Sequence, residues 1–227
     1  MSRIEPPKRP SPLIRLLLRL ARRETARLTG RQTERMIEPF EAYAHLPRLA
    51  MSYGMLEGAT AKLHRVPERV KVLAELKAAT MSTCEYCIDI GSTIARRAGV
   101  SEAQLLALPG YRESDEFDEL EKLVLDYAVG MSRTPVEVSD ELFASLREHF
   151  DDAQLVELTN VLALENMRGR FNGALGIGDA GFSEGMVCAV PERDAVARAT
   201  ASAAPARDGT PADDVAPGSP PLAVRSG

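Results

Sequence analysis

The stretch TMSTCEYCIDIGSTIARRAG (residues 80–99) contains two of the three cysteines in this 227-residue chain, Cys84 and Cys87. If the segment is helical, the two residues lie one turn apart, with Cβ atoms about 5–6 Å from each other. That distance is slightly wide for a disulfide, and a small adjustment in the first turn closes it. The pair also precedes a run that reads as helix up to Gly99, so unsatisfied backbone N–H groups near it favour a thiolate.

Two other interpretations of the cysteine pair are a metal site and two small core residues without chemistry. Structural zinc normally takes four Cys or His ligands. The chain has no second CxxC motif, and its remaining candidate ligands are scattered: Cys188, His45, His64 and His149. We therefore expect no metal. The inert interpretation stays open, because a lone CxxC motif also occurs by chance.

Two carboxylates close to the cysteines bear on their chemistry. Glu85 and Asp89 are negative neighbours, which disfavour the thiolate form. Either could instead accept a thiol proton as a general base. We include Asp89 among the candidate catalytic residues.

The rest of the chain predicts an all-α fold. Helical spacing recurs along it, Pro67 suits a first turn, and Ser101 and Ser139 suit helix caps, whereas strand patterns are scarce. Residues 1–35 read as an extension with a basic amphipathic helix, and residues 36–190 as one helical domain. Residues 191–227 are rich in Ala, Pro, Gly, Ser and Asp, which predicts a disordered tail.

The N-terminal extension has a helical pattern from Leu13 to about Arg35. One face is apolar and the arginines lie mostly off it. Such a helix can lie on an anionic membrane surface, but we favour contact with the domain or with a partner subunit. The apolar face consists of Leu13, Leu16, Leu17 and Leu20.

Composition narrows the location and the partners. A net charge of -5 argues against broad nucleic-acid binding, which needs a basic surface. No apolar run approaches the length of a membrane span, and the N-terminus is a poor signal peptide. Three cysteines are too few for a secreted disulfide framework, so we expect a cytoplasmic protein.

The run CEYCIDIGSTIARRAGVSEAQLLAL (residues 84–108) resembles the core of the carboxymuconolactone decarboxylase family, specifically its alkylhydroperoxidase D-like branch. The similarity extends over roughly residues 36–183. The resemblance implies a helical bundle that forms homo-oligomers, often trimers or hexamers. It also implies that the cysteine pair reduces a small peroxide and is recycled by an electron-donating thiol partner, without haem or flavin.

The chain departs from that family at the proton relay. The family has a His four residues after the second cysteine and a Glu twelve residues before the first; Gly91 and Val72 stand at these positions. Glu75 lies three residues after Val72, so it can face the same side of the helix, and we include it as a candidate catalytic residue. The departure predicts a weak or specialised peroxidase.

Alternatives to a thiol peroxidase are a non-redox oligomer that binds a small apolar ligand and a lactone decarboxylase-like enzyme. The decarboxylase branch typically lacks the cysteine pair, which makes its chemistry a poor match. Two arginines in NMRGRFNGALGIG (residues 166–178) are further candidates. We expect Arg168 to serve a helix C-terminus, and we leave the role of Arg170 open.

Overall fold

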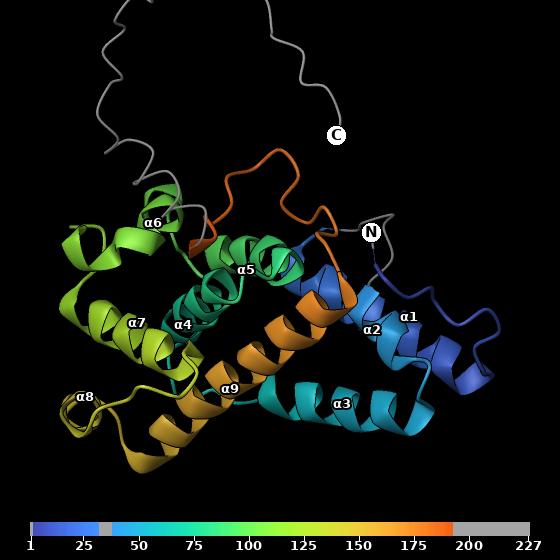
Figure 1. Cartoon of the computed structure of the whole chain (residues 1–227), viewed down its shortest axis with the longest axis horizontal. Coiled ribbons are helices and arrows are strands. Elements are labelled where there is room, and N and C mark those ends of the chain that lie inside the picture. The colour runs from blue at the N-terminus through green and yellow to red at the C-terminus, as the bar shows by residue number, and fades with distance from the viewer. Residues whose placement is uncertain (1, 32–37, 193–227) are drawn as a thin grey trace, which may run out of the picture.

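The computed structural model describes residues 2–31 and 38–192, and all regular secondary structure in them is helical (Figure 1). This confirms the all-α class. The elements are α1 (Pro12–Thr29), α2 (Glu38–Tyr43), α3 (Pro47–Thr60), α4 (Glu68–Met81), α5 (Glu85–Arg97), α6 (Glu102–Ala107), the 3₁₀ turn η1 (Leu108–Glu113), α7 (Glu119–Ser132), α8 (Asp140–Arg147) and α9 (Asp152–Leu175).

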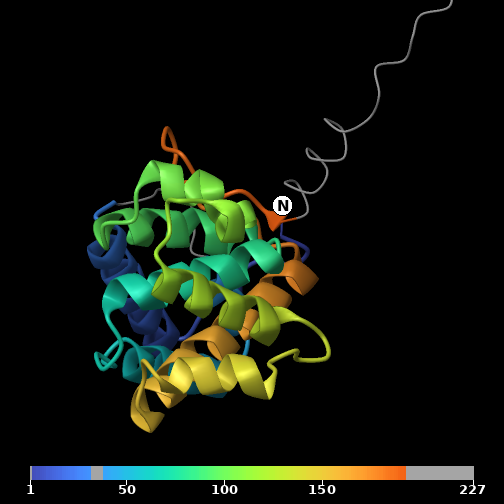
Figure 2. The same ribbon diagram turned by 90° about the vertical axis from the view of Figure 1, so that its left-hand side faces the viewer.

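Helix α4 forms the centre of the bundle. It packs against α5, α7 and α9, and ten of its fourteen residues are buried. A helix that is buried on nearly every side belongs to the interior of a domain. Figures 1 and 2 place α7 and α8 on one side of α4 and the N-terminal helices α1 and α2 on the other.

Local capping signals set most helix boundaries where the sequence predicts them. Ser101 caps α6 in a capping box with Gln104, and Ser139 caps α8 through the Leu142 N–H group. Gly99 has a φ of 86°, a left-handed conformation that suits glycine, one residue after the C-cap of α5. These contacts join residues at most three or four positions apart, so the sequence pattern alone can reveal them.

The N-terminal helix differs from the expectation in length and in orientation. It ends at Thr29, because Gly30 adopts the left-handed conformation and caps it, rather than near Arg35. Its inward-facing residues are Ile14, Thr25 and Thr29, whereas Leu16 and Leu20 are about half exposed. Leu17 is partly buried, so the described domain covers the leucine stripe only in part, and contact with a partner subunit stays a prediction.

The segment after α9 crosses back over α5 and is held there by Asp89. The buried carboxylate accepts hydrogen bonds from the N–H groups of Ala180, Phe182 and Ser183 at 2.7–3.0 Å, and from the Ser183 hydroxyl. Apolar side chains of the segment, including Phe182, complete the core beside α5. Asp89 thus anchors the C-terminal segment to the helix that follows the cysteines.

The predicted disordered tail falls almost entirely on residues 193–227, which lie outside the described part of the chain. Among the described residues, none of the helices is both long and apolar enough to cross a membrane.

Candidate active site

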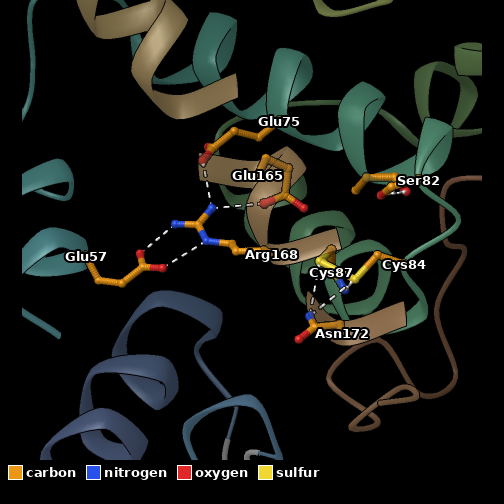
Figure 3. Close-up of a disulfide and its surroundings, with 9 residues drawn as sticks. Glu57, Glu75, Ser82, Cys84, Cys87, Glu165, Arg168 and Asn172 are labelled. Atoms are coloured by element: carbon orange, nitrogen blue, oxygen red, sulfur yellow. Dashed lines mark hydrogen bonds and ion pairs between the residues drawn. A yellow bond between two sulfur atoms is a disulfide. The ribbon is translucent and has the colours of Figure 1, made fainter. Parts of the chain in front are cut away.

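The two cysteines form a disulfide in the turn between α4 and α5 (Figure 3). Cys84 is the N-cap of α5, and Cys87 lies in the first turn, with 5.2 Å between their Cα atoms. The Cys87 N–H group donates to the Cys84 sulfur at 3.2 Å. A backbone donor at a helix N-terminus favours negative charge on the atom that accepts from it. The local geometry therefore favours a thiolate once the disulfide is reduced.

Asn172 of α9 contacts both sulfur atoms. Its buried Nδ2 donates to Cys84 at 3.4 Å and to Cys87 at 3.6 Å. One turn earlier in α9, a Cβ atom on Gly169 would lie 2.4 Å from the Ser82 hydroxyl oxygen, too close for any side chain there. Glycine at this position lets α9 approach the cysteine turn, which brings Asn172 within reach of the sulfurs.

A cavity of about 270 Å³ opens beside Cys87. Cys87 contributes to its wall, whereas Cys84 does not. Helices from both halves of the chain form the lining, and much of it is apolar or aromatic. The lining residues outside the charged groups include Leu28, Phe40, Tyr43, Tyr53, Val72, Leu76, Ile90, Gly91, Ile94 and Phe171.

Three of those aromatic rings form a continuous stack. Tyr43 lies between Tyr53 and Phe171, with ring centroids 4.2 and 4.3 Å away. Burial raises the pKa of both tyrosines above the usual value. The phenols therefore stay neutral, and the stack gives the cavity a wall suited to apolar or planar organic molecules.

The polar part of the cavity is a cluster of three glutamates around Arg168 (Figure 3). Glu57 of α3 binds the guanidinium through two atoms, at 2.9 Å to Nε and 2.5 Å to Nη2. Nη1 donates to Glu75 at 3.2 Å and to Glu165 at 2.9 Å. All four residues line the cavity together with Cys87. Three carboxylates thus share one guanidinium.

Burial raises the pKa of two carboxyl groups in this cluster, Glu75 and Glu165. The pKa of Glu75 is raised to about 7, mainly by burial, with Arg168 opposing the shift and Glu165 adding to it. The pKa of Glu165 is also raised, again mainly by burial, and its Oε1 is buried without a hydrogen-bond partner among the described residues. A carboxyl group with a pKa near 7 can accept and return a proton at physiological pH.

The structure separates the two acids that the sequence singled out. Glu75 lines the cavity beside Cys87, whereas Asp89 does not, because its oxygens accept from the 180–183 segment. Glu85 is exposed and likewise lies outside the lining of this cavity. The placement supports a structural role for Asp89 and leaves Glu75, of these two, in the cavity with Cys87.

The expectation for Arg168 is wrong, because the residue lies a full turn or more before the end of α9 and binds glutamates of three helices. Arg170 is exposed and donates to the Thr134 hydroxyl. His45 and His64 are exposed and do not line the cavity. Among the described residues, no group of three His, Cys, Asp or Glu side chains is arranged to hold a metal ion.

Sequence reasoning missed Asn172, Glu57 and Glu165 as site residues. One signal was present in α9, where Glu165, Arg168 and Asn172 follow one another at intervals of three and four. That spacing places three polar side chains on one face of a largely buried helix, which points to a polar site. Glu57 carried no comparable signal.

Comparison with known proteins identifies the family. The chain is 35% identical to the uncharacterized protein YnjA of Escherichia coli K12 over 176 residues, which span 75% of this chain and 92% of YnjA. The model of the carboxymuconolactone decarboxylase family matches residues 47–129. This chain belongs to the carboxymuconolactone decarboxylase family. The segment that the family model matches includes the cysteine pair, Glu57 and Glu75, and it ends before α9.

Proteins of known structure share the fold of this chain. The debrominase Bmp8 superposes with a TM-score of 0.65 at 21% identity, covering 78% of this chain and 91% of Bmp8. An uncharacterized peroxidase-related protein of Ralstonia eutropha JMP134, described as an alkylhydroperoxidase AhpD core, superposes with a TM-score of 0.60 at 21% identity, covering 80% of this chain and 94% of that protein. At these identities the likeness concerns the fold.

Proposed function

We propose that this protein is a thiol-dependent peroxidase that reduces a small organic hydroperoxide with Cys87 and Cys84. One observation carries the proposal: Cys87 opens into the same cavity as Glu75, a carboxyl group with a pKa of about 7. The site thus combines a nucleophile, a proton carrier and space for a substrate, which are the components that thiol chemistry needs.

In the proposed reaction, Glu75 accepts the Cys87 proton, and the thiolate attacks the terminal oxygen of the hydroperoxide. The O–O bond breaks, the alcohol leaves with the proton returned by Glu75, and Cys87 becomes a sulfenic acid. Cys84 then attacks the Cys87 sulfur, and hydroxide leaves as water with the Cys84 proton. The two thiols have together given two electrons to the substrate and remain as a disulfide. A dithiol donor returns two electrons and two protons.

The roles of the two cysteines follow from their positions. Cys87 meets the substrate because it lines the cavity, and Cys84 resolves the sulfenic acid because it lies behind Cys87 at the helix N-cap. Gly91 cannot carry a proton, so Glu75 has to do the work of a relay histidine alone. We therefore expect a specialised enzyme.

The test is single turnover of the reduced protein with cumene hydroperoxide. The wild type should lose two thiols per hydroperoxide consumed and gain one intramolecular disulfide, seen as a loss of two hydrogens by mass spectrometry. Cys84→Ser should still consume one equivalent and keep a sulfenic acid on Cys87 that dimedone labels. Cys87→Ser should consume none. Consumption without thiol loss, or equal consumption by both variants, would contradict the proposal.

A second candidate is thiol-dependent removal of a halogen from an aromatic ring. The aromatic stack and the fold shared with Bmp8, a debrominase that has been solved in complex with 2,3,4-tribromopyrrole, favour it. The same two electrons would convert an aryl bromide and two thiols into the arene, bromide, a proton and the disulfide. Bromide release from a bromopyrrole, stoichiometric with disulfide, distinguishes this reaction from peroxide reduction.

A further inference from the structure

We propose that the cavity beside Cys87 admits neutral organic substrates and rejects carboxylates, and that Glu57 imposes this selection by occupying Arg168. The inference deepens the proposed thiol chemistry and rests on it for its kinetic consequence. It concerns the charge of the substrate, which the cysteine pair does not determine.

The first observation is the balance of charged groups in the wall. Among the described residues that line the cavity are four glutamates and two cationic side chains. They are Glu57, Glu68, Glu75, Glu165, Lys71 and Arg168. The carboxyl groups outnumber the cations, so the wall holds no surplus of positive charge for a bound carboxylate. Like charges brought together in a confined site oppose binding.

The second observation is that both cations already have carboxylate partners. Lys71 lies 3.0 Å from a Glu157 oxygen and 3.4 Å from a Glu68 oxygen, and it donates to the Leu63 carbonyl. Arg168 gives four N–H bonds to three glutamates. Neither side chain offers an unpaired positive charge to a substrate.

The position of Glu57 makes the exclusion specific. An arginine ordinarily recognises a carboxylate with two parallel N–H bonds along one edge of the guanidinium. Glu57 makes that pair of bonds, using Nε and Nη2. It comes from the peripheral helix α3, and its side chain is 23% exposed. A substrate carboxylate would have to displace Glu57 to reach Arg168.

The remaining wall suits a neutral guest. The stacked rings and the leucine and isoleucine side chains offer apolar contact, and a protonated carboxyl among Glu75 and Glu165 can donate to a neutral oxygen. Organic hydroperoxides without a carboxylate therefore match the cavity. A carboxylated lactone does not, which argues against the decarboxylase-like alternative.

A matched pair of substrates tests the selection. Cumene hydroperoxide and its para-carboxylate analogue have the same O–O bond and the same aromatic ring, and they differ only in charge and the added group. At pH 8 the wild type should show a kcat/KM for the carboxylate at least about 10²-fold lower. Equal values for the two substrates overturn the inference.

Two variants locate the cause. Glu57→Ala uncovers the Arg168 edge and should raise the ratio of kcat/KM for the carboxylated substrate to kcat/KM for cumene hydroperoxide about tenfold or more. Glu68→Ala removes a lining carboxylate that does not contact Arg168, so it serves as the control and should leave the ratio near the wild-type value. An equal gain in this ratio in both variants would show that the total charge of the wall, and not Glu57 in particular, causes the selection. That result would overturn the role of Glu57.

A binding measurement separates this inference from the proposed function. Calorimetry with the oxidised protein compares 4-isopropylbenzamide with 4-isopropylbenzoate, which differ in charge and react with neither cysteine. Binding of the amide but not the benzoate supports the inference even if no hydroperoxide is reduced. Binding of both equally, or of neither, overturns it.

Discussion

At the scale of single residues, the site depends on how one carboxyl group differs from another. Glu75 and Asp89 are both acids near the cysteine pair in the sequence. Glu75 lies in the cavity with a raised pKa, whereas Asp89 accepts hydrogen bonds from the C-terminal segment. A general base must be within reach of the proton it removes and must titrate near the working pH. Of these two acids, Glu75 is the one that shares the cavity with Cys87.

The first prediction concerns the pH dependence that Glu75 imposes. As a base it acts in the ionised form, so kcat/KM should rise with pH through an apparent pKa of about 7. Glu75→Gln should lose that limb and lower kcat/KM by about 10²–10⁴-fold. The measurement is the pH–rate profile of both proteins. An unchanged limb in the variant would assign it to another group.

The second prediction concerns Asn172. Its amide N–H group lies within hydrogen-bond reach of both sulfurs, and a donor to the charged form of an acid lowers its pKa. Asn172→Leu should therefore raise the pKa of the reduced pair, and Asn172→Asp should raise it further through added negative charge. The pH dependence of alkylation by iodoacetamide measures this pKa.

Asn166 provides the control for Asn172. It is buried in the same helix, but its amide donates to Ser132 and to the Leu162 carbonyl instead of to sulfur. Asn166→Leu should lower the melting temperature while the thiol pKa stays at the wild-type value. A purely structural role for Asn172 would give the same pattern in both variants.

At the scale of elements, α5 packs closely on α4 at Gly91. A Cβ atom on Gly91 would lie 3.2 Å from the Leu76 Cδ1 atom, so the leucine has to yield by a few tenths of an ångström. Gly91 also lines the cavity. The glycine thus accommodates a neighbouring helix, and a larger side chain there would extend toward the substrate.

The third prediction follows from that packing. Gly91→His should place an imidazole beside Cys87. Because the unperturbed pKa of an imidazole is about 6.5, it can accept a proton at pH 7, so the variant should consume peroxide faster. Gly91→Ala introduces the same Cβ atom without the imidazole and controls for the shift of Leu76. If both variants fold and react at the parent rate, proton transfer does not limit the reaction.

At the scale of the whole molecule, the C-terminal end of the described residues contacts the interior of the bundle. The Lys77 ammonium, on a fully buried side chain, lies 2.9 Å from a Glu192 oxygen and also donates to the Leu108 carbonyl. Burial lowers the pKa of Lys77, and the Glu192 carboxylate opposes that shift. Glu192 therefore belongs to the packed domain, although composition assigned it to the tail.

The fourth prediction separates Glu192 from the residues after it. Removing residues 193–227 should leave the melting temperature unchanged. Glu192→Ala should destabilise the protein by about 1–2 kcal/mol, because it leaves a buried ammonium with one partner fewer. In a Lys77→Met background the same change should cost much less. Thermal unfolding of the wild type, the truncated protein, the two single variants and the double variant checks this. Equal losses from Glu192→Ala in both backgrounds would contradict the pairing.

Oligomeric assembly also belongs to this scale and stays a prediction. Leu13, Leu16 and Leu20 of α1 are about half exposed, and they offer an apolar surface that the described domain covers only in part.

The sequence by itself determined the features that depend on neighbouring residues. Caps such as Ser101 with Gln104, and the pairing of Cys84 with Cys87, join positions three apart. One helical turn brings such residues together whatever the rest of the chain does. The all-α class and most helix boundaries follow for the same reason.

Only the tertiary structure decided the contacts that give the cysteines their surroundings. Glu57 and Arg168 are separated by 111 positions, and Asn172 and Cys84 by 88. Whether they meet depends on how α3, α9 and α5 pack around α4, and on Gly169 letting α9 come close to the cysteine turn. The raised pKa of Glu75 comes from burial. Burial depends on all the helices that close the cavity, so no local pattern of residues predicts it.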